Sequence, residues 1–281
     1  MSLSRIMIVI MIVVTVLGIG VIVRDHLFQK QMKKETKIFL QEMSEQPSMS
    51  IDQNQLDLLP LPVMKWLNLT HALDHEPISS VWISQKGMLR TKPDGKWMPF
   101  DAEQHSGIDC PSYIWTSEIE AMRGVTIYGR DIYQNHEADM LIKLMGNFTV
   151  GSGSGPELIQ GSLVRYLAEI VWYPQVVLSS DITWEAIDDH AAKADITYGD
   201  VNASGIFYFK DNGEPERFVA ERYMENGGEY TLEEWSVSID KYEEVRGILI
   251  PTEGNVYWNL KEGPFHWLQF EVTDAKFERR Q

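Results

Sequence analysis

The residues best suited to chemistry lie on one predicted helix in the middle of the chain. Arg165 and Glu169 are four positions apart, and Trp172 follows three positions after Glu169. Side chains at these spacings share one face of a helix, so the guanidinium and the carboxylate can form an ion pair. On an exposed helix face such a pair contributes only about 0.3–0.5 kcal/mol to stability.

Aromatic residues surround this pair in the sequence. Tyr166, Trp172 and Tyr173 lie on the same segment, and Trp184 follows shortly afterwards. Large aromatic side chains gain free energy on burial, so their number argues against an exposed face. We therefore expect a buried or half-buried polar site, with an ordinary structural ion pair as the alternative. The candidate ligand-binding residues are Arg165, Glu169, Trp172, Tyr173, Trp184 and Trp97.

Two motifs that resemble anion or metal sites are incomplete. The Gly-Ser-Gly-Ser-Gly-Pro run at 151–156 lacks the Lys-Ser/Thr pair of a phosphate-binding loop, and Pro156 has no backbone N–H to donate. His71 and His75 have the spacing of two metal ligands on a helix, but no Glu follows His71 and no third ligand is evident. We expect these to be surface histidines.

Signatures of a catalytic nucleophile are also missing. Asp188, Asp189 and His190 could form an acid–base cluster, but they lie between two predicted strands, where polar turn residues are common. The sequence has no Gly-x-Ser-x-Gly motif, and Cys110 has no activating partner that the sequence reveals. We assign no catalytic residue and expect neither a metal nor a cofactor.

The segments around the central helix predict successive antiparallel strands. Alternating hydrophobicity begins after Pro77, and short turns rather than helices separate the alternating segments. The glycine run 151–156 is expected to interrupt the strands, and the helix is expected at 156–172. The strands expected from residue 111 onward are 111–119, 123–133, 137–145, 181–187, 192–199, 203–210, 215–224, 229–240, 246–260 and 265–278.

The predicted fold class is therefore mainly antiparallel β within an α+β chain. We expect one curved half-barrel sheet packed against the central helix, which lies on its concave face. A short helix opened by Pro60 and Pro62 is expected to bury Val63, Trp66 and Leu67. Asn212-Gly213 predicts a tight hairpin turn in the second half of the sheet.

An apolar run precedes these elements. Ile6–Val23 holds 18 residues without a charge, which as a helix would be about 27 Å long and could cross a bilayer. A cleaved signal peptide would have a shorter apolar region and a small-x-small cleavage site, and neither is present. We expect a transmembrane anchor at 1–23, a helical juxtamembrane stalk at 24–50 and one β domain at 51–281.

Composition narrows the range of partners. Hydrophobic residues make up 44% of the 281 residues, enough for a packed core, so disorder is excluded as the main state. Cys110 is the only cysteine, which excludes an intramolecular disulfide. The formal net charge is −16, and such a chain has no general affinity for nucleic acid.

Several motifs resemble those of a family of uncharacterised membrane-anchored bacterial proteins, over most of residues 55–275. They are Leu-Pro-Leu-Pro-Val at 59–63, Gly-Met-Leu-Arg at 87–90, Trp-x-Pro-Phe at 97–100, the segment 164–174 and Trp-Glu-Ala at 184–186. Residues 247–252 and 272–277 resemble the last strands of the lipoprotein carrier LolA and acceptor LolB. That resemblance implies a curved sheet closed by helices around a lipid-binding cavity. The chain departs from the acceptor because it lacks a lipobox cysteine.

The expected function is membrane-anchored binding of an apolar or amphipathic ligand, such as a lipid or a lipoprotein acyl chain, between sheet and helix. One alternative is a hydrolase or transferase that uses Glu169 as acid–base and Arg165 as anion clamp, with Asp188 or His190. Another is a non-catalytic envelope interaction module with a filled core. The count of Lys and Arg beside the span favours a cytoplasmic domain, whereas the carrier resemblance favours the extracytoplasmic side of the cytoplasmic (inner) membrane, which we adopt.

Overall fold

One antiparallel sheet of 13 strands dominates the part of the chain that the computed structural model describes, residues 3–45 and 53–279. The strands are β1 (Ile78–Leu89), β2 (Met98–Gly107), β3 (Ser112–Met122), β4 (Val125–Gln134), β5 (Glu137–Leu144), β6 (Phe148–Ser154), β7 (Ile182–Asp188), β8 (Ala191–Tyr198), β9 (Val201–Phe209), β10 (Pro215–Asn226), β11 (Glu229–Val245), β12 (Ile248–Leu260) and β13 (Gly263–Arg279). Their order in the sheet is β6-β5-β4-β3-β2-β1-β13-β12-β11-β10-β9-β8-β7.

Helices connect and cover this sheet. The α-helices are α1 (Leu3–Ser44), α2 (Leu61–Leu69) and α3 (Pro156–Glu169), and the 3-10 helices are η1 (Gln53–Leu58), η2 (Ala72–Asp74), η3 (Ile170–Trp172) and η4 (Pro174–Leu178). Helix α2 begins after Pro60, and it buries Val63, Trp66 and Leu67 as the sequence predicts.

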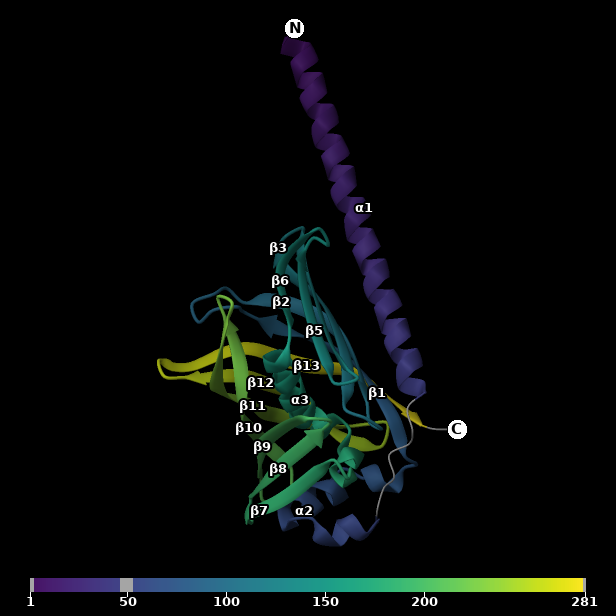
Figure 1. Ribbon diagram of the computed structural model, residues 1–281, viewed down its shortest axis with the longest axis vertical. Helices are drawn as coiled ribbons and strands as arrows, with labels where there is room; N and C mark the ends of the chain where they lie inside the picture. The colour runs from purple at the N-terminus through teal and green to yellow at the C-terminus, as the bar shows by residue number, and fades with distance from the viewer. Residues whose placement is uncertain (1–2, 46–52, 280–281) are drawn as a thin grey trace.

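The strand order divides the sheet into two meanders. Strands β1 to β6 pair in sequence, as do β7 to β13, and the pairing of β1 with β13 joins the two sets. Strands β6 and β7 are therefore the two edges, and α3 with η3 and η4 leads from one edge to the other. The sheet curls around α3, which lies inside the curve (Figure 1). The expected half-barrel with a helix on its concave face is confirmed.

Helix α3 forms where the sequence predicts it. Gly155 has a φ of 102°, which favours glycine, and Pro156 occupies the first helical turn, where its missing N–H costs nothing. Leu163 and Leu167 are fully buried against the sheet. The helix ends at Glu169 and tightens into η3, so the expected span 156–172 consists of an α-helix followed by a 3-10 turn.

The glycine run does not interrupt the strands, and that prediction is wrong. Gly151 pairs with Ile142 and Gly153 pairs with Met140, so the run forms the edge strand β6. Glycine has a low strand propensity, but here its missing side chain leaves room for neighbours. A Cβ at Gly153 would lie 3.4 Å from Met140 Cε and 3.5 Å from Leu158 Cδ2. Packing against β5 and α3 therefore decides this segment.

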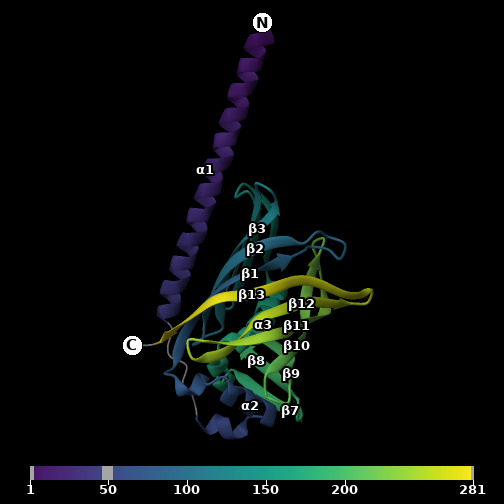
Figure 2. The same ribbon diagram turned by 180° about the vertical axis from the view of Figure 1, so that it is seen from behind.

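Helix α1 is one continuous element rather than a span followed by a separate stalk helix. Its N-terminal half projects beyond the domain, and its C-terminal half lies along the outer face of β3 to β5 (Figures 1 and 2). Phe28 packs on Tyr128, while Phe39 and Met43 pack on Ile114. The end of the predicted stalk, residues 46–50, lies outside the described residues.

An ion-pair cluster around a buried arginine reinforces this contact. Arg130 of β4 is 7% exposed, and its Nη1 lies 3.0 Å from Glu35 Oε2 of α1. Its Nη2 pairs with Asp139 on the neighbouring strand β5. Because Glu35 is on α1 and its partner Arg130 is on β4, this ion pair ties α1 to the sheet.

Candidate ligand-binding site

The predicted ion pair forms on the concave side of the sheet. Arg165 Nε lies 2.7 Å from Glu169 Oε1, and the two side chains are 15% and 11% exposed. This excludes the exposed-face interpretation, since both groups have lost most of their contact with bulk water. The Arg165 guanidinium also lies 4.6 Å from the ring centre of Tyr113, so an aromatic face supports the cation.

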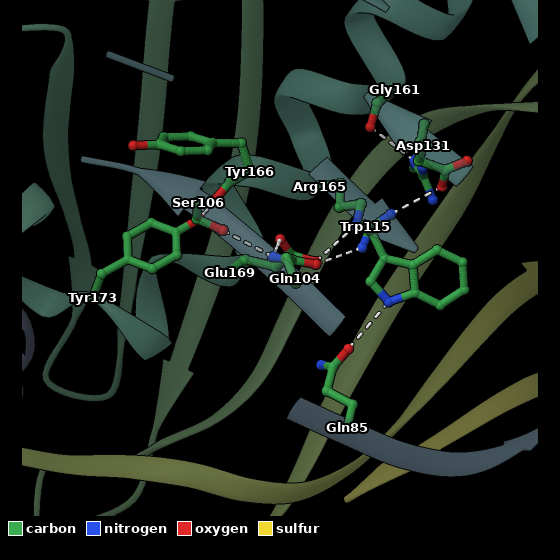
Figure 3. A network of polar contacts seen from close by, with 11 residues as sticks. Gln85, Gln104, Ser106, Trp115, Asp131, Gly161, Arg165, Tyr166, Glu169 and Tyr173 are labelled. Atoms are coloured by element: carbon green, nitrogen blue, oxygen red, sulfur yellow. Dashed lines mark hydrogen bonds and ion pairs between the residues drawn. The ribbon is translucent and has the colours of Figure 1, made fainter. Parts of the chain in front are cut away.

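Two further side chains complete the coordination of Arg165. Nη1 lies 3.0 Å from Asp131 Oδ2 on β4, and Nη2 donates to Gln104 Oε1 on β2 at 2.8 Å. Gln104 Nε2 in turn donates to the second oxygen of Glu169 at 2.7 Å. Figure 3 shows the resulting closed network, which ties α3 to two strands. Each nitrogen of the guanidinium thus has a partner.

Burial and charge act against each other in this network. Burial lowers the pKa of Arg165, but Glu169, Tyr113 and Asp131 together outweigh it and raise that pKa above its ordinary value. Burial raises the pKa of Asp131, and the nearby Arg165 guanidinium offsets only part of this effect. We call Arg165, Glu169, Asp131 and Gln104 the clamp. Each of them is a partner of at least one other, so removing one leaves a polar group unpaired.

A cavity of about 640 Å³ lies between α3 and the sheet. Its wall includes Arg165, Glu169 and Trp172, and most of the remaining wall is aromatic or aliphatic. Five of the nine tryptophans line it, namely Trp115, Trp172, Trp235, Trp258 and Trp267. Val150 and Glu225, which are exposed, also belong to the wall, so the cavity reaches the surface.

A second arginine lies on the same wall. Arg222 of β10 donates from Nε to the carbonyl oxygen of Gly161 in α3 at 2.9 Å. Its guanidinium lies 4.9 Å from the ring centre of Trp235 and 5.8 Å from that of Trp258. Burial lowers the pKa of Arg222, and repulsion from Arg165 acts in the same direction.

Of the other sequence-predicted site residues, Trp172 lies on the cavity wall, whereas Tyr173, Trp184 and Trp97 do not. Trp172 lines the cavity, and its Nε1 donates to the carbonyl oxygen of Pro251 at 3.0 Å. Tyr173 is fully buried, and its hydroxyl donates to the carbonyl oxygen of Tyr166. Trp184 packs edge-on against Trp66 of α2, and Trp97 meets His266 edge-on near the start of β13. A role in ligand binding stays a prediction for all of them.

The histidine pair and the Asp-His cluster that the sequence analysis considered lie away from the clamp. His71 pairs with Asp74 on the surface, whereas His75 contacts the carbonyl oxygen of Gly247. His190 lies on the exposed β7–β8 turn and contacts Asp211. Asp188 accepts a hydrogen bond from the His190 backbone on the same turn. These groups have local structural partners and do not line the cavity.

Cys110 is half-buried beside Ser112, and burial raises the pKa of its thiol. A raised pKa leaves less thiolate at neutral pH, so this cysteine is a poor nucleophile. The structure thus gives no support to Cys110 as a reactive group.

Asp131, Gln104 and Arg222 are not identified as site residues by the sequence analysis. The strand positions of two of them could have indicated that role. Asp131 and Arg222 stand at inward positions of predicted strands, in register with apolar residues two positions away. A charged residue on the buried face of a strand needs a partner, which marks it as a candidate site residue. Gln104 carries no such mark, because an uncharged amide is less unusual inside a sheet.

A family model matches residues 49–270, which is most of the chain, and it is described as a family of unknown function (DUF6544). The chain belongs to the DUF6544 family. No curated protein matches this DUF6544 chain at a significant level.

Solved structures from other families are similar to this DUF6544 protein. One is a DUF1329 family protein from Desulfovibrio piger, with 10% identity and a TM-score of 0.41, covering 78% of this chain and 94% of that one. Another is a LolA superfamily protein from Nitrosomonas europaea, with 12% identity and a TM-score of 0.39, covering 78% and 92%.

Proposed function

We propose that this protein binds an apolar or amphipathic ligand, such as a lipid or a lipoprotein acyl chain, between α3 and the curved sheet. The observation that carries the proposal is the cavity of about 640 Å³ with its aromatic and aliphatic wall. Protein interiors are normally close-packed, and apolar walls gain free energy when an apolar group replaces water. Cavities of this size and character are typical of small-molecule sites.

The clamp supports binding rather than catalysis. Both oxygens of Glu169 accept hydrogen bonds, from Arg165 and from Gln104, and every nitrogen of Arg165 is occupied. A general acid or base must be free to reach a substrate proton, which these groups are not. We infer that Arg165 and Glu169 hold α3 at a fixed distance from β2 and β4 and so keep the cavity open.

We further propose that α1 anchors the domain in the cytoplasmic membrane as a single pass. The helix is long and apolar enough to cross a membrane. Asn147 on the β5–β6 turn donates from Nδ2 to the carbonyl oxygen of Val21 at 3.1 Å, so this turn lies beside the end of the apolar run. The anchor would hold the cavity close to the source of an amphipathic ligand.

Lipid extraction tests the binding function directly. The full chain would be purified in mild detergent, extracted with organic solvent and analysed by mass spectrometry for bound lipids. We expect lipid in stoichiometric amount with the wild type, and little with Ala168→Trp, because Ala168 lines the cavity from α3 and an indole there would occupy it. Ala186→Trp is the matched control, since Ala186 is exposed on β7.

Equal lipid content in all three proteins, with the same folded signal by circular dichroism, would place the lipid in the detergent micelle and contradict the proposal. Stoichiometric lipid that only Ala168→Trp loses would support it.

The side of the membrane is part of the same proposal, and we adopt the extracytoplasmic side. Cys110 is half-buried and a weak nucleophile, so an introduced cysteine gives a cleaner test. Glu262→Cys, on the exposed β12–β13 turn, would be made in a Cys110→Ser background. A membrane-impermeant maleimide should label it in intact cells, whereas labelling only after lysis would assign the domain to the cytoplasm.

A further inference from the structure

Arg222 is a half-buried cation on the cavity wall that the clamp leaves without an acidic partner. Within the part of the chain that the structure describes, its one hydrogen bond runs from Nε to the Gly161 carbonyl oxygen, and it forms no ion pair with a carboxylate. A guanidinium carries five N–H groups, four of them on the two Nη atoms. Those four donors lie on the wall of the cavity with no protein acceptor.

The nearby carboxylates do not fill this role. Asp131 and Glu169 are close enough to attract Arg222, but both form their ion pairs with Arg165. The Arg165 charge also repels the Arg222 charge. A half-buried guanidinium that has no carboxylate partner has donors left for an incoming anion, so the site favours one.

The surroundings of Arg222 suit the rest of such a ligand. The indoles of Trp235 and Trp258 lie against its guanidinium, and beyond them the wall continues with Phe265 and Leu268. Planar, bidentate donation from arginine matches both carboxylate and phosphate oxygens. The chain as a whole has an excess of Asp and Glu, which disfavours general binding of anions to its surface.

We propose that the ligand is an anionic amphiphile, with its carboxylate or phosphate on the Nη atoms of Arg222 and its hydrocarbon chain against Trp235 and Trp258. This inference rests on the proposed function. It adds that the ligand is negatively charged and that Arg222 binds the charged group. A free fatty acid and a monoacyl phosphate share the required chemistry, and separate probes distinguish them.

Quenching of tryptophan fluorescence by a brominated chain provides the test. The full chain would be placed in phosphatidylcholine nanodiscs and titrated with 9,10-dibromostearic acid or its methyl ester, which differ in charge but not in chain. We expect the acid to bind the wild type at least tenfold more tightly than the ester. Arg222→Gln should remove this preference and leave ester binding within about twofold, and Arg222→Lys should keep part of it.

Arg246→Gln is the matched control, because Arg246 contacts Asp274 and the Ala275 carbonyl oxygen away from the cavity. It should leave the preference for the acid unchanged, although it removes the same charge. A brominated monoacyl phosphate that binds more tightly than the acid, and loses this advantage in Arg222→Gln, would support the inference with phosphate as the bound group.

The outcomes separate the two proposals. Equal binding of acid and ester to the wild type would overturn the anionic ligand while leaving the binding function standing. Quenching by neither probe beyond that of free indole in the same nanodiscs would count against both. If Arg222→Gln fails to fold, the acid–ester comparison on the wild type and on Arg222→Lys still decides.

Discussion

Arg165 Nη1 and Asp131 Oδ2 lie 3.0 Å apart and join helix α3 to strand β4 across the cavity wall. The two residues are 34 positions apart in the chain, so this contact exists only in the folded domain. Glu169 is a second carboxylate on the same guanidinium, so Arg165 forms ion pairs with two carboxylates at once. Any change to one member therefore alters the charge balance of the other two.

Replacing Arg165 should be strongly destabilising. Arg165→Met would leave both Asp131 and Glu169 buried without their cation, and we expect a loss of about 3–5 kcal/mol in the free energy of unfolding. Urea denaturation followed by tryptophan fluorescence measures this change. Because Asp131 would remain unpaired, adding Glu169→Leu should recover only part of the loss, and adding Asp131→Asn as well should recover more. A change below about 0.5 kcal/mol in the single variant would show that the clamp is energetically neutral.

Two truncations should behave differently because α1 has two roles. Removing residues 1–24 deletes the apolar run but keeps Phe28, Phe39 and Met43 on the sheet, so we expect a folded, soluble domain. Removing residues 1–45 also uncovers Tyr128 and Ile114, and burial of each lost apolar side chain is worth about 1.5–3 kcal/mol. The longer deletion should therefore lower the melting temperature and promote aggregation, as measured by light scattering. Equal melting temperatures for both truncations would contradict the packing role.

Acid should weaken the fold through His105. This residue lies on the outer face of β2 beside Trp82 and Ile114, and burial lowers its pKa to about 4. Between pH 6.5 and pH 4 the unfolded chain binds a proton that the folded chain does not, so stability falls as the pH falls. We expect His105 to account for about 2 kcal/mol of that loss, after allowing for its partial exposure.

His105→Gln is the control for this pH dependence. The variant should lose stability less steeply between pH 6.5 and pH 4, while His266, whose pKa burial also lowers, contributes equally in both proteins. If the unfolding free energy of the wild type and of His105→Gln fell equally steeply with pH, His105 would not be the cause of the acid destabilisation.

Two glycines should respond in opposite ways to alanine. A Cβ at Gly161, inside α3, would lie 3.4 Å from Arg222 Nε and 3.6 Å from Arg222 Cγ, which are ordinary contacts. Because glycine weakens a helix interior, Gly161→Ala should stabilise the protein by about 0.5–1 kcal/mol. A Cβ at Gly205 would approach the buried Phe218 ring to 2.1 Å, so Gly205→Ala should destabilise by about 1–3 kcal/mol. Thermal denaturation ranks the two, and the reverse order would contradict the packing of β9 on β10.

The sequence alone determined the elements and the local pair. Alternating hydrophobicity predicts strands because successive side chains point to opposite faces, and Arg165 meets Glu169 because four positions make about one helical turn. The predicted turn at Asn212-Gly213 follows in the same way: Gly213 has a positive φ of 94°, and its N–H donates to the Lys210 carbonyl oxygen at 2.9 Å. These features depend on neighbours within a few residues, which the sequence displays directly.

Tertiary structure decided everything that joins distant segments. The glycine run became a strand because β5 and α3 offer it partners, and α1 continues to Ser44 because β3 to β5 bury its apolar face. The pairing of β1 with β13 joins the two meanders into one sheet, and the curled sheet brings Asp131 and Arg222 to the same cavity as Arg165. Burial, and with it the loss of water around a charge, depends on what the rest of the chain packs against each side chain, which no local pattern contains.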